Sequence, residues 1–238
     1  VLPEYRIRQP RKNYAAGFVF NEHNINANVL WGNAAYLLAV NVIREFDRIS
    51  WFGFLRAHDK VGNHGALINL KDESGSLLKT SIDIFSESDG FWAEQGFVPV
   101  SSIYLSKQLG IFSNQSVWNP TSEVNKTSGM LQTNLMACRF GHYIKVKMRD
   151  RVGRFVRAAT CQRDLKRWLE TYISNLDYGD EAIMARYPLK SADVKFIEDR
   201  YDSTRYHCQI KLQPQYQYEM LDSHITLMTD VSSDKLGG

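Results

Sequence analysis

The most basic stretch of the chain, residues 139–157, strongly limits what the polypeptide can fold into. Apolar residues recur at every fourth position there and just before it, at Met136, Phe140, Ile144 and Met148. This spacing places them in one line along a helix, and we predict that helix over residues 131–149. Lys147 breaks the pattern because it points among the apolar residues. A cation in such a place either extends its long stem to solvent or meets another protein.

The last third of the chain alternates apolar and polar residues in three short runs. The residues expected on the apolar face are Val194, Phe196, Tyr206, Cys208, Ile210, Leu212, Ile225, Leu227 and Thr229. A period of two is typical of half-buried strands, so these runs predict a small antiparallel sheet with one apolar face. A three-stranded sheet has two edges, and exposed edges accept strands from other chains.

The rest of the sequence predicts further helices and strands, and the whole is a mixed α+β fold. We expect a helix opening near Leu30 with a core stripe of Ala35, Leu38, Val42, Phe46 and Ile49. Further helices are predicted at 87–96, 161–176 and 180–187, strands at 50–56, 80–85 and 97–100, and a polar loop at 9–28. A polar linker at 121–129 divides the chain into predicted domains 1–125 and 126–238.

Charge is strongly segregated along the 238 residues, which are enough for one or two domains. Residues 1–125 carry a net charge of −1, residues 126–167 carry +9 and residues 168–238 carry −5. The basic block could meet nucleic acid, a membrane surface or an acidic protein surface. No apolar run approaches the ~20 residues of a membrane-spanning helix. The three cysteines (Cys138, Cys161 and Cys208) predict a reducing compartment without a disulfide framework.

No nucleotide-binding loop, zinc-protease motif or nucleophile elbow is present, so we predict neither an enzyme nor a cofactor. Cys138 and His142 are one helical turn apart, but two ligands do not make a metal site. A buried thiol beside a hydrogen-bonded histidine is the favoured interpretation of that pair. We expect His23, His58 and His64 to be solvated, and Glu87 and Asp89 to cap a helix.

The basic helix has three interpretations, which depend on what its cations contact: Lys145, Lys147, Arg149, Arg151, Arg154 and Arg157. It could be a solvated face, although +9 over this block is high for that. It could bind nucleic acid, helped by Phe140, Tyr143 and Phe155, but these aromatic residues fit the core better than a stacking platform. It could also dock on an acidic protein surface, including that of another copy.

Six motifs occur in order along the chain: Leu30–Tyr36 (LWGNAAY), Gly96–Pro99 (GFVP), Phe112–Ser116 (FSNQS), Arg139–Val146 (RFGHYIKV) with Arg149–Gly153 (RDRVG), Arg167–Leu169 (RWL) and Ala185–Leu189 (ARYPL). Together they resemble the C-terminal half of the large subunit of the type VI secretion contractile sheath, the TssC or VipB family. The sequence departs from the pattern at residues 118–120 and 161–163, which favours a divergent branch such as IglB.

The resemblance implies a non-enzymatic sheath subunit of the bacterial cytoplasm that binds neither membrane nor nucleic acid. In that family, a heterodimer with a small subunit (TssB, VipA or IglA type) polymerises into a helical sheath around the Hcp tube and contracts to deliver effectors. Expected partners are the small subunit, further copies of this chain, the Hcp tube and baseplate proteins. The ClpV unfoldase contacts the N-terminal half in this family. The chain starts at Val1, and we expect that half to lie outside it.

The resemblance also implies the contractile-sheath core fold, with long helices packed on a sheet. Residues 1–125 would then be part of the middle sheath domain, and residues 126–238 the C-terminal domain. The terminal sheet would interlock with strands of neighbouring subunits.

Overall fold

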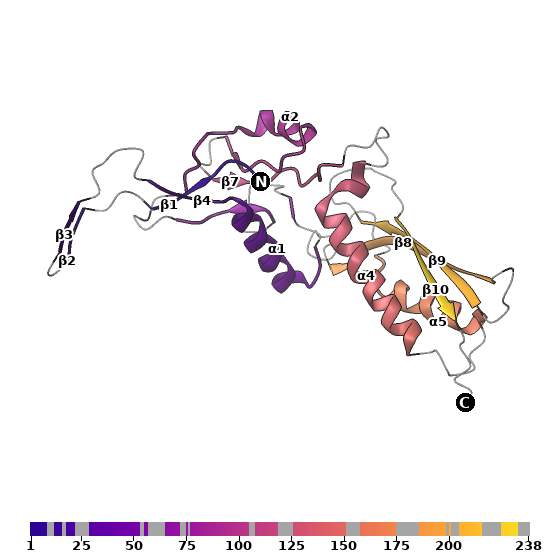
Figure 1. The fold of residues 1–238 in the computed structure, drawn as a ribbon. Helices are drawn as coiled ribbons and strands as arrows, with labels where there is room; N and C mark the ends of the chain where they lie inside the picture. The colour runs from indigo at the N-terminus through magenta and orange to yellow at the C-terminus, as the bar shows by residue number, and fades with distance from the viewer. Residues whose placement is uncertain are drawn as a thin grey trace. The chain divides into compact units, whose positions relative to one another are not determined.

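A computed structural model describes residues 1–8, 12–15, 18–21, 29–52, 55–56, 65–71, 75, 77–104, 108–118, 126–150, 158–174, 186–198, 200, 205–215 and 225–232 (Figure 1). The chain forms two compact units. Unit 1 contains residues 1–48 and 54–119, and unit 2 contains residues 49–53 and 120–238.

Unit 1 combines one long helix with short, antiparallel strand pairs. Its sheets are β1 (Tyr5–Arg8) with β4 (Leu30–Gly32), β2 (Lys12–Ala15) with β3 (Phe18–Asn21), and β5 (Leu67–Ile68), β7 (Leu109–Gly110) and β6 (Ser101–Ser102) in that spatial order. Its helices are α1 (Ala35–Ile49), η2 (Ser86–Ser88) and α2 (Asp89–Glu94). The loop predicted at 9–28 was therefore wrong in part, because β2 and β3 lie within it.

Helix α1 starts later than predicted, and it buries a different face. Asn33 caps it, since its Oδ1 accepts a hydrogen bond from the Ala35 backbone N–H at 2.8 Å. The buried positions are Ala34, Leu37, Asn41, Glu45 and Ile49, whereas Ala35 and Phe46 of the predicted stripe are exposed. Ala34 and Leu37 join the core of unit 1 with Ala66, Ile68, Leu78, Val100, Leu109 and Ile111.

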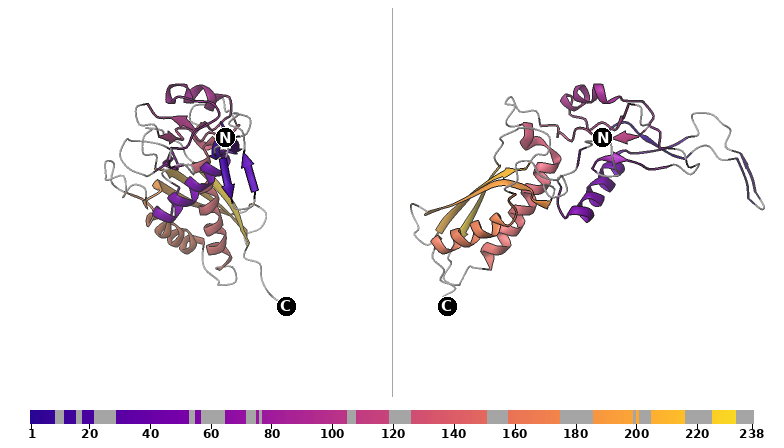
Figure 2. Two further views of the ribbon diagram at one scale, coloured as in Figure 1. Left: turned by 90° about the vertical axis from the view of Figure 1, so that its left-hand side faces the viewer. Right: turned by 180° about the vertical axis from the view of Figure 1, so that it is seen from behind.

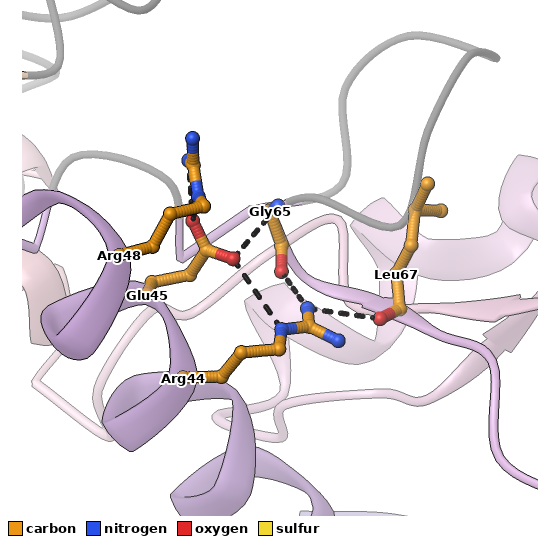
Figure 3. Close-up of polar contacts among 5 residues, drawn as sticks. All are labelled: Arg44, Glu45, Arg48, Gly65 and Leu67. Atoms are coloured by element: carbon orange, nitrogen blue, oxygen red, sulfur yellow. Dashed lines mark hydrogen bonds and ion pairs between the residues drawn. The ribbon is translucent and has the colours of Figure 1, made fainter.

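The shift of the buried face is explained by Glu45, whose carboxylate is fully buried but satisfied (Figure 3). It accepts hydrogen bonds from Arg48 Nη2 at 2.6 Å and from the Gly65 backbone N–H at 3.1 Å. Arg44 approaches it at 3.4 Å and also donates to the carbonyls of Gly65 and Leu67. A buried charge is tolerated when it is paired and hydrogen-bonded in this way, so a polar side chain occupies a core position.

The short elements of unit 1 agree only partly with the predictions. The helix predicted at 87–96 is confirmed by η2 and α2, and Gly96 follows with a φ of +83°, a conformation that favours glycine. The strands predicted at 80–85 and 97–100 were wrong, because Thr80, Phe85 and Pro99 make only isolated bridges. The described part of 50–56 is likewise not a strand, although Trp51 and Leu55 are buried.

Unit 2 packs two helices against a three-stranded sheet (Figure 2). Its elements are η3 (Thr127–Gly129), α4 (Leu131–Arg149), α5 (Ala158–Glu170), β8 (Leu189–Glu198), β9 (Arg205–Pro214) and β10 (Ile225–Ser232). The strands are antiparallel in the order β10-β9-β8, with α5 against β8 and α4 against β10. The predicted α+β class, helix 131–149 and terminal sheet are confirmed. Helix α5 begins and ends earlier than predicted, and most of 180–187 lies outside the described residues.

None of the helices in the described part of the chain is both long and apolar enough to cross a bilayer.

Candidate inter-subunit surfaces

The apolar line predicted for α4 is its buried face. The exposed fractions of Met136, Phe140, Ile144 and Met148 are 6%, 0%, 1% and 5%. Phe140 stacks on Trp51 with ring centroids 4.8 Å apart, and Tyr172 and Trp168 meet Phe140 edge-on at 5.4 and 6.1 Å. Aromatic pairs of this kind contribute about 1 kcal/mol each beyond their burial. Since Phe140 is fully buried, it is not available to stack on a nucleic-acid base.

Two cations of α4 lie on the rings of this cluster. The guanidinium of Arg139 lies over Trp51, 4.3 Å from the ring centroid, and donates hydrogen bonds to Tyr143 Oη at 3.2 and 3.1 Å. It also donates to the Ser50 carbonyl. Lys147 Nζ is 4.8 Å from the centroid of Trp168. A cation–π contact within unit 2 therefore explains why Lys147 points among apolar residues.

The opposite side of α4 is polar and basic. Its exposed residues are Asn134, Cys138, His142, Lys145 and Arg149. Cys138 was therefore wrongly interpreted as buried, and His142 beside it is exposed as well. Arg151, Arg154 and Arg157 lie outside the described residues, as do His23, His58 and His64. Among the described residues, no group of three or more metal-ligating side chains comes together.

The terminal sheet has the single apolar face that the alternation predicts. Val194, Cys208, Ile210 and Leu212 are all at most 1% exposed. Across the sheet, Val194 pairs with Ile210 and Phe196 with Cys208, while Ile210 pairs with Leu227 on the other side. Burial raises the pKa of Cys208 to about 12, with a further contribution from Cys161, so this thiol stays protonated at neutral pH.

Strand β10 differs from its two neighbours. Ile225, Leu227 and Thr229 face the same side as the buried residues of β9, yet they are only half-buried. Met228 on the other side is 72% exposed. Strand β10 is thus an edge strand whose inner face is incompletely covered.

The carboxylates expected to cap a helix have other roles. Asp89 is buried and accepts a hydrogen bond from Ser101 Oγ at 3.1 Å, and Glu87 is exposed. Desolvation raises the pKa of Asp89 above its ordinary value, an effect opposed by the Ser101 bond and by the charge of Arg56. The expected cap at Asp89 was therefore wrong.

Unit 1 presents an apolar surface that the sequence analysis missed. Phe91 is 60% exposed, Phe97 38%, Val117 85% and Trp118 51%. Phe91 contacts Trp92 edge-on at 5.5 Å, and Trp92 contacts Phe97 at 6.1 Å. The only available signal was the density of aromatic residues in a segment with no strong period, which does not distinguish surface from core.

In comparisons with known proteins, both halves of the chain match domains of one family. Residues 1–118 match the EvpB/VC_A0108 tail sheath N-terminal domain, and residues 121–231 match the EvpB/VC_A0108 tail sheath gpW/gp25-like domain. The chain is also 28% identical over 258 residues to the type VI secretion system sheath protein TssC1 of Pseudomonas aeruginosa. That alignment covers 98% of this chain and 51% of the relative, so the chain spans about half of the relative's length. The family drawn from the motifs is confirmed: this chain belongs to the type VI secretion sheath proteins, in the family of the large subunit TssC/VipB.

Proposed function

We propose that this chain is a structural subunit that polymerises with a small sheath subunit into a helical tube around an Hcp tube in the bacterial cytoplasm. Contraction of that tube would drive effector delivery. Contacts between two different surfaces of a subunit generate an open helical filament when the rotation between subunits does not close a ring, and a sheath requires such a filament. Contraction needs two alternative packings of the same parts. Baseplate proteins and ClpV complete the proposed set of partners.

The observation that carries the proposal is the incompletely covered edge strand β10. An added strand beside β10 would gain main-chain hydrogen bonds and cover Ile225 and Leu227, which are half-buried in the single chain. Main-chain pairing survives changes in side-chain packing. Subunits joined in this way could stay connected while they rotate.

The other edge of the sheet is less suited to an added strand. The Leu189 N–H donates to the Tyr172 carbonyl, and the Leu189 carbonyl accepts from the Ser174 N–H, both at 3.2 Å. Farther along β8, the Phe196 N–H donates to Gln162 Oε1 of α5 at 3.4 Å. These contacts occupy backbone groups of β8, whereas β10 forms no described strand pairing except with β9. We therefore assign the interlocking role to β10.

The cations of the basic block are proposed to contact the inner tube or adjacent sheath subunits: Lys145, Lys147, Arg149, Arg151, Arg154 and Arg157. Lys145 and Arg149 are the exposed members on α4. Charge reversal of Arg149 and Arg154 should weaken assembly, and the loss should shrink as ionic strength rises because salt screens exposed charges.

Deleting residues 222–238 tests the strand-exchange role. We expect the shortened chain to form a soluble complex with the small subunit but no filaments in electron micrographs. Deleting only residues 233–238, which follow β10, is the matched control and should leave filaments intact. Normal filaments from the longer deletion would refute the role of β10.

A further inference from the structure

Helix α2 and the turn before it present an acidic and aromatic stripe. Glu87, Phe91 and Glu94 are spaced four and three residues apart, and all three are exposed, Phe91 by 60%. Glu87 lies in the 3-10 turn η2, and Phe91 and Glu94 lie in α2, with Ser88 at the junction of the two elements. Phe91 and Glu94, three residues apart in α2, share one face of that helix. We call these three residues the acidic stripe.

The residues near the acidic stripe in sequence include no lysine or arginine that could balance its negative charge. Residues 81–104 contain four acidic residues and no lysine or arginine. One of the four, Asp89, is turned inward to Ser101, and the others are exposed. Among the described residues, neither Glu87 nor Glu94 forms an ion pair. The exposed ring of Phe91 between them offers a face on which a cation can lie.

Helix α4 carries the opposite pattern in the other unit. His142, Lys145 and Arg149 are exposed at spacings of three and four residues, and we call them the basic stripe. Seven residues of helix separate the first from the last, a rise of about 10 Å, and Glu87 and Glu94 are also seven residues apart in sequence. Lys145 and Arg149 form no ion pair with any described residue, in contrast to Arg139 and Lys147, which lie on rings of unit 2.

We propose that the acidic stripe of one copy docks on the basic stripe of a second copy of this chain. Glu87 would pair with Arg149, the Phe91 ring would lie beneath Lys145, and Glu94 would lie opposite His142. This inference rests on the proposed sheath function and names one contact within it. The two stripes are different surfaces on one chain, so each copy offers one of each, and the contact builds an open filament when the rotation between copies does not close a ring.

The contact is expected to be weak for a single pair of copies. Stable interfaces bury about 800 Å² on each partner, and one aromatic ring between two carboxylates supplies a small part of that. Repetition along a filament would make it effective, since linked contacts raise one another's local concentration. Because the contact is charged, its strength depends on salt, and the opposite charges of the two stripes determine which surface meets which.

Sedimentation velocity of the complete chain at low ionic strength, over a range of concentrations, tests the proposal. Glu87→Lys with Glu94→Lys gives a copy with two basic surfaces, and Lys145→Glu with Arg149→Glu gives a copy with two acidic surfaces. Each double variant alone should self-associate at least about tenfold more weakly than the parent chain. An equimolar mixture of the two should associate as well as the parent, because only alternating copies present opposite charges. Phe91→Ser should weaken association without removing its salt dependence.

Arg163→Glu with Arg167→Glu is the matched control, since it makes the same change of charge one turn apart on exposed positions of α5. It should leave association unchanged. The proposal is overturned if this control weakens association equally, if the mixture associates no better than its components, or if association is independent of concentration. Electron microscopy with the small subunit separates the two proposals. If filaments still form when these charges are reversed, the contact between the stripes is refuted and the sheath function stands. If the mixture regains association but no filaments form, the contact stands and the sheath function is refuted.

Discussion

Helices α1 and α4 both carry apolar residues at helical spacing, but only α4 buries all the residues that the spacing selects. Of the stripe predicted for α1, Ile49 is buried whereas Ala35 and Phe46 are exposed. In α4, Met136, Phe140, Ile144 and Met148 form the buried face. In α1, Tyr36 and Ile43 are each 68% exposed, whereas Asn41 and Glu45 are buried. The buried Glu45 has hydrogen-bond partners, whereas Asn41 Nδ2 has none among the described residues, so Glu45 is the residue that accounts for the buried face of α1.

The difference has a specific physical source. Glu45 receives hydrogen bonds from Arg48 and the Gly65 N–H, so its desolvation is compensated where it lies. Two cations of α4, Arg139 and Lys147, lie on aromatic rings rather than beside carboxylates, and the apolar line of α4 stays buried. The two helices therefore place charge at buried or half-buried positions by two different means.

The largest expected effect belongs to α4. Phe140→Ala should lower the free energy of unfolding by about 4 kcal/mol, because it removes a fully buried ring together with its stacked and edge-on contacts. Urea denaturation followed by circular dichroism measures this change. Ile43→Ala on α1 is the control and should stay within about 0.5 kcal/mol. If the two substitutions cost the same, the contrast between the helices is mistaken.

A slightly smaller effect is expected on α1. Glu45→Ala should cost about 3 kcal/mol, since it leaves the Gly65 N–H and two half-exposed arginines without their acceptor. The same denaturation experiment applies. Asp47→Ala, an exposed carboxylate on the same helix, should change stability little. Equal stability of the parent and Glu45→Ala would show that the buried network does not position α1.

Asp89 is also a buried carboxylate of unit 1, and its titration tests whether its desolvation is compensated as that of Glu45 is. Its pKa is raised from 3.8 by burial, so the folded chain binds more protons than the unfolded chain just above that pH. The free energy of unfolding should therefore fall as pH rises through that window. Asp89→Asn should remove this dependence in urea titrations at several pH values, and Asp83→Asn, at an exposed position, should retain it. Loss of the Asp89 hydrogen bond through Ser101→Ala should cost about 1 kcal/mol.

The smallest effect concerns the lysine that breaks the pattern of α4. Lys147→Gln should lower the free energy of unfolding by about 0.5 kcal/mol, because it removes the cation from the ring of Trp168. Lys145→Gln, two residues earlier on the same helix and exposed, should have no measurable effect. If Lys147→Gln no longer lowers the free energy of unfolding in a Trp168→Leu chain, the loss comes from the contact with the ring. If the same loss persists in that chain, the assignment is contradicted.

Regular elements of unit 2 could be predicted from sequence, whereas much of unit 1 could not. Helix α4 and strands β8–β10 have long, regular periods, and each buries one face against an element nearby. The segments of unit 1 depend on distant partners. Tyr5 bridges Thr80, and Phe85 bridges Ser102, so alternation in 80–85 carries no information about pairing. The β2–β3 hairpin does carry a strand signal, the run Phe18-Val19-Phe20, which the loop predicted at 9–28 ignored.

The candidate surfaces show the same limit. Alternation identified the buried face of β9, and the four-residue period identified the apolar line of α4. Neither pattern could show that Lys147 would lie on Trp168, or that Cys138 would be exposed, because both outcomes depend on what packs beside the helix. The exposed ring of Phe91 was missed for the same reason.

The position of Trp51 has a practical consequence for dissecting the chain. This residue belongs to unit 2, although the segments on both sides of it in sequence belong to unit 1. A fragment beginning at residue 120 would therefore lack the Trp51 indole, which stacks on Phe140 and lies beneath the Arg139 guanidinium. We expect such a fragment to fold poorly on its own. Supplying residues 49–53 as a separate peptide, or grafting them ahead of α4, would be needed to recover an independent C-terminal piece.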